Sequence, residues 1–283
     1  MFEALFPSFL ITFREALEAA LIVAIMTSYL RKVGKGELNR YAYLGTGAAL
    51  VVSLVLGAAI QIVYGGLDKV TAQLFEGFAS LTAVAVLTYM IFWMTEHSKK
   101  IKGELQEQLD VVISRGELYG ITALSFVAVV REGLETVLFL STSFFQDATG
   151  TAIGAAAGAG VVLVIAALLS RGVYNLDLKK FFRYTSVLLV IFAAGLAGYG
   201  IHELLEAGEN MGYDFGFLAA KAYDINPPVN LDGSYPLLHE KGIVGSILKA
   251  LVGYDGNPEW LRVAVYLGYW VVVGFYLYRR NRE

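Results

Sequence analysis

Long apolar segments separated by shorter polar connections dominate the chain. A helix needs about 20 predominantly apolar residues to cross a bilayer, and seven segments reach that length. They cover residues 4–30, 41–64, 70–95, 118–145, 152–170, 184–206 and 260–278 approximately. The pattern predicts an all-α polytopic membrane protein in which residues 1–283 form one integral membrane domain.

The connection 207–259 is the long exception, because it is rich in Gly, Pro, Asn and Asp and has no sustained periodicity. Within it, the segment Lys241–Tyr254 is apolar but too short to cross a bilayer. We expect a surface-lying or re-entrant helix there.

Basic residues are distributed unevenly among the connections. Segments 31–40, 97–116 and 171–183 carry four Lys or Arg each, and 279–283 carries three. The other connections carry only Lys69, Lys221, Lys241 and Lys249. Because cytoplasmic loops are enriched in Lys and Arg, the N-terminus is expected outside and the C-terminus in the cytoplasm, as an odd number of spans requires.

The predicted outer segments carry ten acids, which favour either ordinary solvated loops or a vestibule that concentrates cations. These acids are Glu3, Asp68, Asp147, Glu209, Asp214, Asp224, Asp232, Glu240, Asp255 and Glu259.

Composition agrees with a membrane protein, since 57% of residues are hydrophobic and only 17% are charged. The absence of cysteine excludes disulfides, thiolate metal sites and iron–sulfur clusters. No basic residue precedes the first apolar segment, so we expect that segment to be retained rather than cleaved as a secretory signal.

Two small patterns indicate packing rather than chemistry. Tyr89, Trp93 and Trp260 lie near predicted span ends, where aromatic side chains anchor helices at the membrane interface. The segment Gly154–Gly158 reads GAAAG, which is typical of closely packed membrane helices.

One charged motif, R-E-x-L-E, occurs twice, in the first and the fourth predicted spans. Its members are Arg14, Glu15, Glu18, Arg131, Glu132 and Glu135. Each copy begins roughly 10 to 14 residues into its span, close to the bilayer midplane at 1.5 Å per residue. The two spans are expected to run in opposite directions, which predicts a 3+3 inverted repeat plus one extra helix, with a site between the repeats.

These charges are costly in a membrane, at about 2.5–3.5 kcal/mol each at the centre of a helix. Buried ion pairs that lock neighbouring helices together would explain one Arg–Glu pair. They do not explain four glutamates for two arginines. The surplus indicates protonated carboxyls, a bound cation or a hydrated cavity.

A second group of polar residues lies near the predicted outer side. It comprises Glu76, His202, Glu203 and Glu206. His202 and Glu206 are four residues apart and share a helical face. Carboxylates with an imidazole suit a transition metal, although polar helix ends that reach water give the same pattern. The segment HELLE lacks the second histidine of the HExxH zinc-protease motif.

The two R-E-x-L-E motifs, together with the HELLEAG segment at the end of the sixth span, resemble the oxidase-dependent iron permease family. That family includes fungal high-affinity iron permeases and bacterial EfeU-type permeases. The resemblance implies iron as substrate, as Fe3+ or Fe2+, with no permanently bound cofactor. It assigns metal contacts to Glu15, Glu18, Glu132 and Glu135, with Arg14 and Arg131 as their ion-pair partners. The outer metal contacts fall on Glu76, His202, Glu203 and Glu206.

The resemblance also implies a multi-pass protein of the bacterial cytoplasmic membrane. It implies an extracytoplasmic partner that oxidises or delivers iron, namely a cupredoxin, a peroxidase or a multicopper oxidase. No enzymatic activity and no nucleic-acid partner are expected.

Other functions stay open at this point. They are a proton-coupled transporter of another divalent metal such as Mn, Zn or Pb, a metal exporter, a carrier of an anionic substrate, a membrane enzyme with a carboxylate-bound metal centre, and an assembly subunit.

Overall fold

The structure, a computed structural model, describes residues 4–97, 101–170, 178–230 and 234–280. Each of the seven apolar segments forms one long helix in it. These helices are α1 (Leu5–Lys32), α2 (Asn39–Gly65), α3 (Lys69–His97), α5 (Leu118–Gln146), α6 (Ala148–Ser170), α7 (Leu178–Asn210) and α9 (Trp260–Arg280). The shorter elements are η1 (Gly36–Leu38), α4 (Ile101–Ser114), η2 (Gly216–Leu218) and α8 (Ile243–Val252).

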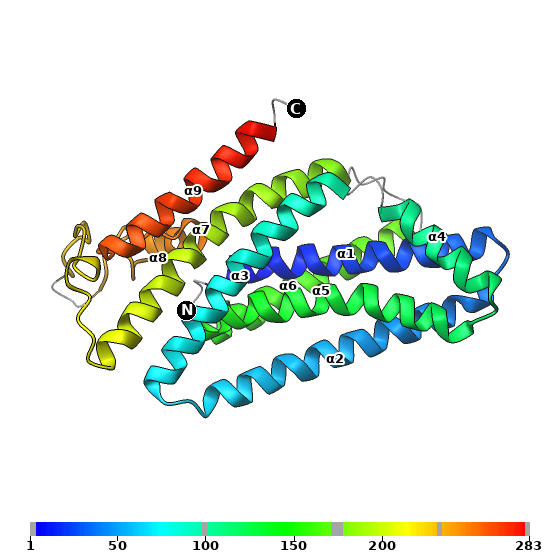
Figure 1. Cartoon of the computed structure of the whole chain (residues 1–283), viewed down its shortest axis with the longest axis horizontal. Helices are drawn as coiled ribbons and strands as arrows, with labels where there is room; N and C mark the ends of the chain where they lie inside the picture. The colour runs from blue at the N-terminus through cyan, green and yellow to red at the C-terminus, as the bar shows by residue number, and fades with distance from the viewer. Residues whose placement is uncertain (1–3, 98–100, 171–177, 231–233, 281–283) are drawn as a thin grey trace.

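The long helices associate in pairs that are distant in sequence. α1 packs most extensively against α6, α2 against α5, and α3 against α7. α1 also lies along α5, which joins the first two pairs into one group of four. In Figure 1 these four helices follow the long axis of the molecule, whereas α3, α7 and α9 are inclined to it.

Glycines allow the α1–α6 pair to come into backbone contact. A Cβ atom added to Gly154 would lie 2.2 Å from the carbonyl oxygen of Leu5, and one added to Gly158 would lie 2.6 Å from that of Phe9. No larger residue fits at these positions without moving a helix. The packing role predicted for the GAAAG segment is therefore confirmed.

The α2–α5 pair repeats this contact. A Cβ atom added to Gly45 would lie 2.2 Å from the carbonyl oxygen of Thr122. Thr122 precedes Arg131 by nine residues, and Leu5 precedes Arg14 by the same number. The two R-E-x-L-E helices therefore contact their partners at corresponding positions.

Four helical segments are long and apolar enough to cross a membrane: Gly36–Gly65, Lys69–Trp93, Ala148–Ala167 and Thr185–Asn210. α1 and α5 have sufficient length, but each carries the three charges of its motif. The apolar part of α9, Trp260–Tyr276, is shorter. The count of seven spans stays a prediction.

α4 was not predicted, because residues 97–116 were interpreted only as a basic connection. Leu105 and Leu109 of α4 are buried with Met26, Leu30 and Ile121 of α1 and α5. A signal was present in the sequence, since Leu105, Leu109 and Val112 follow a helical spacing of four and three. Polar and charged residues lie between these apolar positions, so the segment does not stand out as apolar along the chain.

The connection between α7 and α9 contains the short helix that the sequence predicts, α8. Residues 220–222 of this connection, which precede α8, are held to the start of α9 by backbone hydrogen bonds. The amide of Ala222 donates to the carbonyl of Pro258 at 2.8 Å, and that of Trp260 to Ala220 at 3.1 Å. Glu3, Asp232 and parts of the basic connections (98–100, 171–177 and 281–283) lie outside the described residues.

Candidate functional site

α1 and α5 bring three of the four motif glutamates together. One carboxylate oxygen each from Glu15, Glu132 and Glu135 lies within 4.8 Å of the other two. Glu15 and Glu132 are buried, and Glu135 is nearly so. We call these residues the three-carboxylate cluster. In the part of the chain that the structure describes, it is the one group of three or more such side chains close enough to share a metal ion.

Most oxygens of the cluster lack a hydrogen-bond donor, and Glu135 Oε1 accepts from Nε of Arg131. Both oxygens of Glu15 and one oxygen each of Glu132 and Glu135 are buried without a hydrogen-bond partner among the described residues. Buried, unpartnered carboxylates repel one another strongly and are costly to desolvate. Arg14 and Arg131 offset part of this charge, and a bound cation or added protons would compensate the rest. Because oxygen ligands bind divalent ions at about 2.0–2.6 Å, one ion between the three oxygens could contact all of them.

Glu18 lies outside this cluster and stays with its own arginine. Its Oε1 is 3.0 Å from Nε of Arg14, one helical turn away, and Arg14 is completely buried. The guanidinium also lies 3.6 Å from Glu15. None of its nitrogens has the alignment of a true hydrogen bond. Arg14 therefore balances charge at the cluster without fixing its geometry tightly.

Arg131, the second motif arginine, has a different environment. Its Nε lies 3.1 Å from Oε1 of Glu135, and its guanidinium carbon lies 4.9 Å from the centre of the Trp93 ring. It borders a cavity of about 270 Å³, which we call the inner cavity. The lining residues are Val86, Tyr89, Met90, Trp93, Arg131 and Glu135. Trp93, predicted as an interface anchor, therefore contacts a charged residue of the motif.

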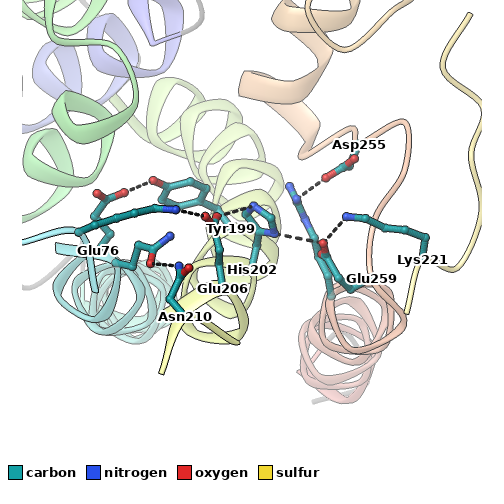
Figure 2. Close-up of polar contacts among 11 residues, drawn as sticks. Glu76, Tyr199, His202, Glu206, Asn210, Lys221, Asp255 and Glu259 are labelled. Atoms are coloured by element: carbon teal, nitrogen blue, oxygen red, sulfur yellow. Dashed lines mark hydrogen bonds and ion pairs between the residues drawn. The ribbon is translucent and has the colours of Figure 1, made fainter. Parts of the chain in front are cut away.

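Glu76 is buried between two tyrosines. The hydroxyls of Tyr64 and Tyr199 donate to its two carboxylate oxygens, one to each. Tyr64 comes from the end of α2 and Tyr199 from α7, so this contact joins three helices. Figure 2 shows Glu76 facing Tyr199.

His202 and Glu206 take part in a chain of ion pairs at the same end of α7 (Figure 2). Nδ1 of His202 lies 3.2 Å from Glu259, and its Nε2 lies 3.8 Å from Glu206. Glu206 is 3.1 Å from Nζ of Lys69. The ligand atoms of Glu76, His202, Glu203 and Glu206 do not converge into a group of three or more among the described residues. The predicted outer site is therefore dispersed over several separate contacts.

Sequence reasoning missed the partners of these outer residues. Tyr64 lies at the end of α2, Lys69 at the start of α3, Tyr199 on α7 and Glu259 directly before α9, so most of these contacts join different elements. Periodicity within one helix carries no information on such contacts. Only the position of Glu259 immediately before an apolar segment marks it as a helix-end residue.

Many of the outer acids have local structural roles. The carboxylate of Asp68 accepts from the hydroxyl and the amide of Thr71 at the start of α3. Asp255 pairs with Arg262, and both are buried. Six of the ten outer acids make such contacts: Asp68, Asp147, Asp214, Asp224, Asp255 and Glu259. These contacts give most of the predicted outer acids a local structural role, and a vestibule that concentrates cations stays a prediction.

Glu259, the residue directly before α9, contacts the connection between α7 and α9 and also contacts α7 itself. It accepts from Lys221 and faces His202. Burial alone would raise the pKa of Glu259, but hydrogen bonds from His202 and Lys221 outweigh burial and lower that pKa to about 2. The ionised carboxylate thus stabilises the attachment of the 211–259 segment.

This pKa predicts how the attachment depends on pH. Because the pKa in the folded protein lies below the ordinary value of about 4.3, the stabilisation is complete above that value and is lost as pH falls towards 2. Hydrogen exchange of the Ala222 and Trp260 amides, corrected for intrinsic rates, is expected to be faster in Glu259→Gln at pH 7. The difference from the unmodified protein should disappear near pH 2. Its disappearance between pH 7 and pH 5 would contradict this assignment.

Removing one tyrosine hydroxyl should weaken the contact at Glu76. In Tyr199→Phe the carboxylate loses one of its two donors, and a hydrogen bond to a charged group contributes about 1.5–3 kcal/mol. We expect a lower thermal unfolding temperature in detergent. Tyr213→Phe, at an exposed position, is the control. An equal effect of Tyr199→Phe in a Glu76→Gln background would show that the loss does not arise from this contact.

Comparison with known proteins identifies the family of this chain. The sequence profile described as "Iron permease FTR1 family" matches residues 5–280, nearly the whole chain. The chain belongs to the iron permease FTR1 family. The resemblance noted from the two motifs is thereby confirmed, and members of the FTR1 family are permeases rather than enzymes.

Individual relatives agree with the FTR1 assignment. The chain is 36% identical over 271 residues to "Ferrous iron permease EfeU" of Yersinia pestis, covering 94% of this chain and 90% of that protein. It is 34% identical over 268 residues to the EfeU of Escherichia coli O6:K15:H31, covering 94% and 92%. An uncharacterized protein of Archaeoglobus fulgidus is 44% identical over 259 residues, covering 92% and 89%. No solved structure matches the chain.

Membership in the FTR1 family and the apolar helices together identify a multi-pass membrane protein. The three-carboxylate cluster lies on the two helices whose charges would otherwise be the most costly in a bilayer.

Proposed function

We propose that the protein carries iron across the cytoplasmic membrane and that the three-carboxylate cluster is its central binding site. The observation that supports this most strongly is the convergence of Glu15, Glu132 and Glu135, with buried oxygens that lack donors, in a chain of the iron permease FTR1 family. Carboxylate oxygens accept Fe2+ as well as Fe3+. The names of the ferrous iron permease relatives favour Fe2+ as the carried form.

We further propose seven spans, formed by α1, α2, α3, α5, α6, α7 and α9, with the N-terminus outside. In this arrangement α1–α3 and α5–α7 are inverted repeats. The matching contacts of Gly154 with Leu5 and of Gly45 with Thr122 support the proposal, because α1 corresponds to α5 and α6 to α2. The cluster then lies at the interface of the repeats near the midplane, where transporters of this architecture bind their substrates.

In this mechanism Arg14 and Arg131 reduce the energetic cost of the buried carboxylates when no iron is bound. Together they offset two of the four motif carboxylates, and the iron ion offsets the others when it binds. An inside-negative potential favours inward movement of the cation by about 2.3 kcal/mol per charge per 100 mV. Glu76, His202, Glu203 and Glu206 line the outer approach, and their existing partners would have to yield for any of them to contact iron directly.

A partner outside the membrane completes the proposal. We propose a cupredoxin, peroxidase or multicopper oxidase that oxidises or delivers iron at the outer face of the protein. If purified protein alone moves iron in liposomes at a rate that the added partner does not change, transport does not require this partner.

Reconstitution tests the function directly. Purified protein in liposomes with an inside-negative potential should take up labelled iron, supplied as Fe2+ with ascorbate or as a soluble Fe3+ chelate. A 100-fold excess of Mn2+, Zn2+ or Pb2+ is expected to compete only weakly. Uptake of Mn2+ or Zn2+ at the iron rate would favour a general divalent-metal carrier. No iron flux under either condition, with or without the added partner, would refute the proposal.

A further inference from the structure

The two R-E-x-L-E motifs are identical in their charged residues but unequal in their surroundings. The side chain of Arg14 is 1% exposed, whereas that of Arg131 is 44% exposed. α1 and α5 make corresponding backbone contacts elsewhere, so the motif residues alone do not account for this difference in exposure. It reflects what lies next to each arginine.

A half-exposed guanidinium at this depth cannot face lipid without a large penalty. Charged side chains within membrane spans face the protein interior or a water-filled cavity. The inner cavity supplies such a space, since Arg131 forms part of its wall. We therefore regard the inner cavity as hydrated.

Glu135 belongs to both features. It contributes an oxygen to the three-carboxylate cluster and also lines the inner cavity. The corresponding residue of the first motif, Glu18, is bound to the buried Arg14 and lies outside the cluster. Among the described residues of the cluster, Glu135 is the one that lines the inner cavity, so it joins the central site to that space.

The inner cavity lies towards one end of α3. Trp93 comes four residues before the end of this helix at His97, about 6 Å along the helix axis. Val86 lies further in, on the same wall. In the orientation proposed above, this end of α3 faces the cytoplasm.

We propose that the inner cavity is the vestibule through which the cation leaves the three-carboxylate cluster towards the cytoplasm, and that Arg131, positioned by Trp93, is its gate. This inference rests on the proposed transport function. The cation and the guanidinium compete for Glu135, because both are positive and both need its oxygens. The Trp93 ring gives the planar guanidinium a second position when the cation occupies Glu135.

Cysteine labelling tests the vestibule, and the chain is suited to it because it contains no native cysteine. Val86→Cys places a thiol on the cavity wall. Val84→Cys is the matched control, two residues away, because Val84 is similarly half-buried but does not line the cavity. Each variant is treated with a membrane-impermeant thiol reagent in right-side-out and in inside-out vesicles.

We expect Val86→Cys to react at least tenfold faster from the cytoplasmic side than from the outside, and at least tenfold faster than Val84→Cys. Saturating Fe2+ should change this rate. Equal rates for the two variants, or faster reaction from the outside, would overturn the vestibule. A disulfide-linked dimer of Val86→Cys would also overturn it, because a second copy of the chain would then cover the face.

Iron flux measured in the same preparations separates the two proposals. Flux in Val86→Cys without cytoplasmic labelling refutes the vestibule alone. Absence of flux in the unmodified protein refutes the proposed function, whatever the labelling.

Trp93 variants test the gate. In Trp93→Leu the guanidinium keeps only its carboxylate partners, Glu135 at 3.1 Å and Glu132 at 3.8 Å. The KM for iron should therefore rise about two- to five-fold, the change expected for loss of one cation–π contact. The kcat should change less, and Trp93→Phe should lie between Trp93→Leu and the unmodified protein. A KM unchanged in Trp93→Leu, or an equal effect of Leu and Phe, would show that Trp93 does not position Arg131.

Discussion

Replacing Glu132 by Gln is expected to lower iron uptake about ten- to a hundred-fold. The substitution keeps the size of the side chain but removes one negative charge from the three-carboxylate cluster. A charge-assisted contact contributes about 1.5–3 kcal/mol, and each 1.4 kcal/mol corresponds to a factor of ten. Initial rates of labelled-iron uptake in reconstituted liposomes measure the effect.

The same substitution should not destabilise the protein without iron. Glu132 is buried, and one of its oxygens has no hydrogen-bond partner. A neutral side chain there reduces the repulsion among the three carboxylates. Glu107→Gln, on the exposed face of α4, is the control and should transport at the normal rate. Normal uptake in Glu132→Gln would contradict the assignment of the cluster as the binding site.

Gly158→Val should cause a large loss of stability, because α6 lies in backbone contact with α1 at this position. A Cβ at this position would lie 2.6 Å from the carbonyl oxygen of Phe9 and 2.9 Å from the amide nitrogen of Phe13. Both are backbone atoms, so no side-chain rotation relieves the clash and α6 must move away from α1. Overpacking typically costs about 1–3 kcal/mol and occasionally more, and a clash with backbone atoms is expected at the upper end of this range.

Gly160→Val is the matched control, because a Cβ there meets nothing within 4 Å. Thermal unfolding in detergent should show a marked drop for Gly158→Val and little change for Gly160→Val. Iron uptake should fall with Gly158→Val, since α1 carries Glu15 and must keep its place beside α5. Similar unfolding temperatures for the two variants would mean that this contact does not set the position of α1.

Much of the helical fold is predictable from the sequence because apolar segments of membrane length have few alternatives to a helix. The predicted ranges agree closely with α2, α5 and α9. α7 begins six residues before the predicted 184, at Leu178, because a helix continues through the polar residues that precede an apolar segment. α4 was missed for the related reason that its apolar face is narrow and its mean hydropathy low.

The candidate site is predictable only in part. Spacing within each motif places Glu15 and Glu18, and likewise Glu132 and Glu135, on one side of their helices. It cannot show which of them reach the other helix, and the structure leaves Glu18 with Arg14. That result depends on how far α1 and α5 are displaced along each other, which the spacing within one motif does not determine.

The predicted outer residues show a second limit to what the sequence alone can predict. The sequence groups Glu76 with His202, Glu203 and Glu206 because all lie at the same end of their spans. The structure gives Glu76 two tyrosines and gives Glu206 a lysine. Such partners come from separate helices, so the composition of one helix cannot identify them.

Anomalous scattering at the iron edge from crystals of the protein grown or soaked with iron tests the central claim most directly. The account predicts one dominant peak between α1 and α5, with oxygens of Glu15, Glu132 and Glu135 about 2.0–2.6 Å away. Loss of this peak in Glu132→Gln crystals would support it further. Iron bound only near His202 and Glu206, with no peak at the three-carboxylate cluster, would contradict the account.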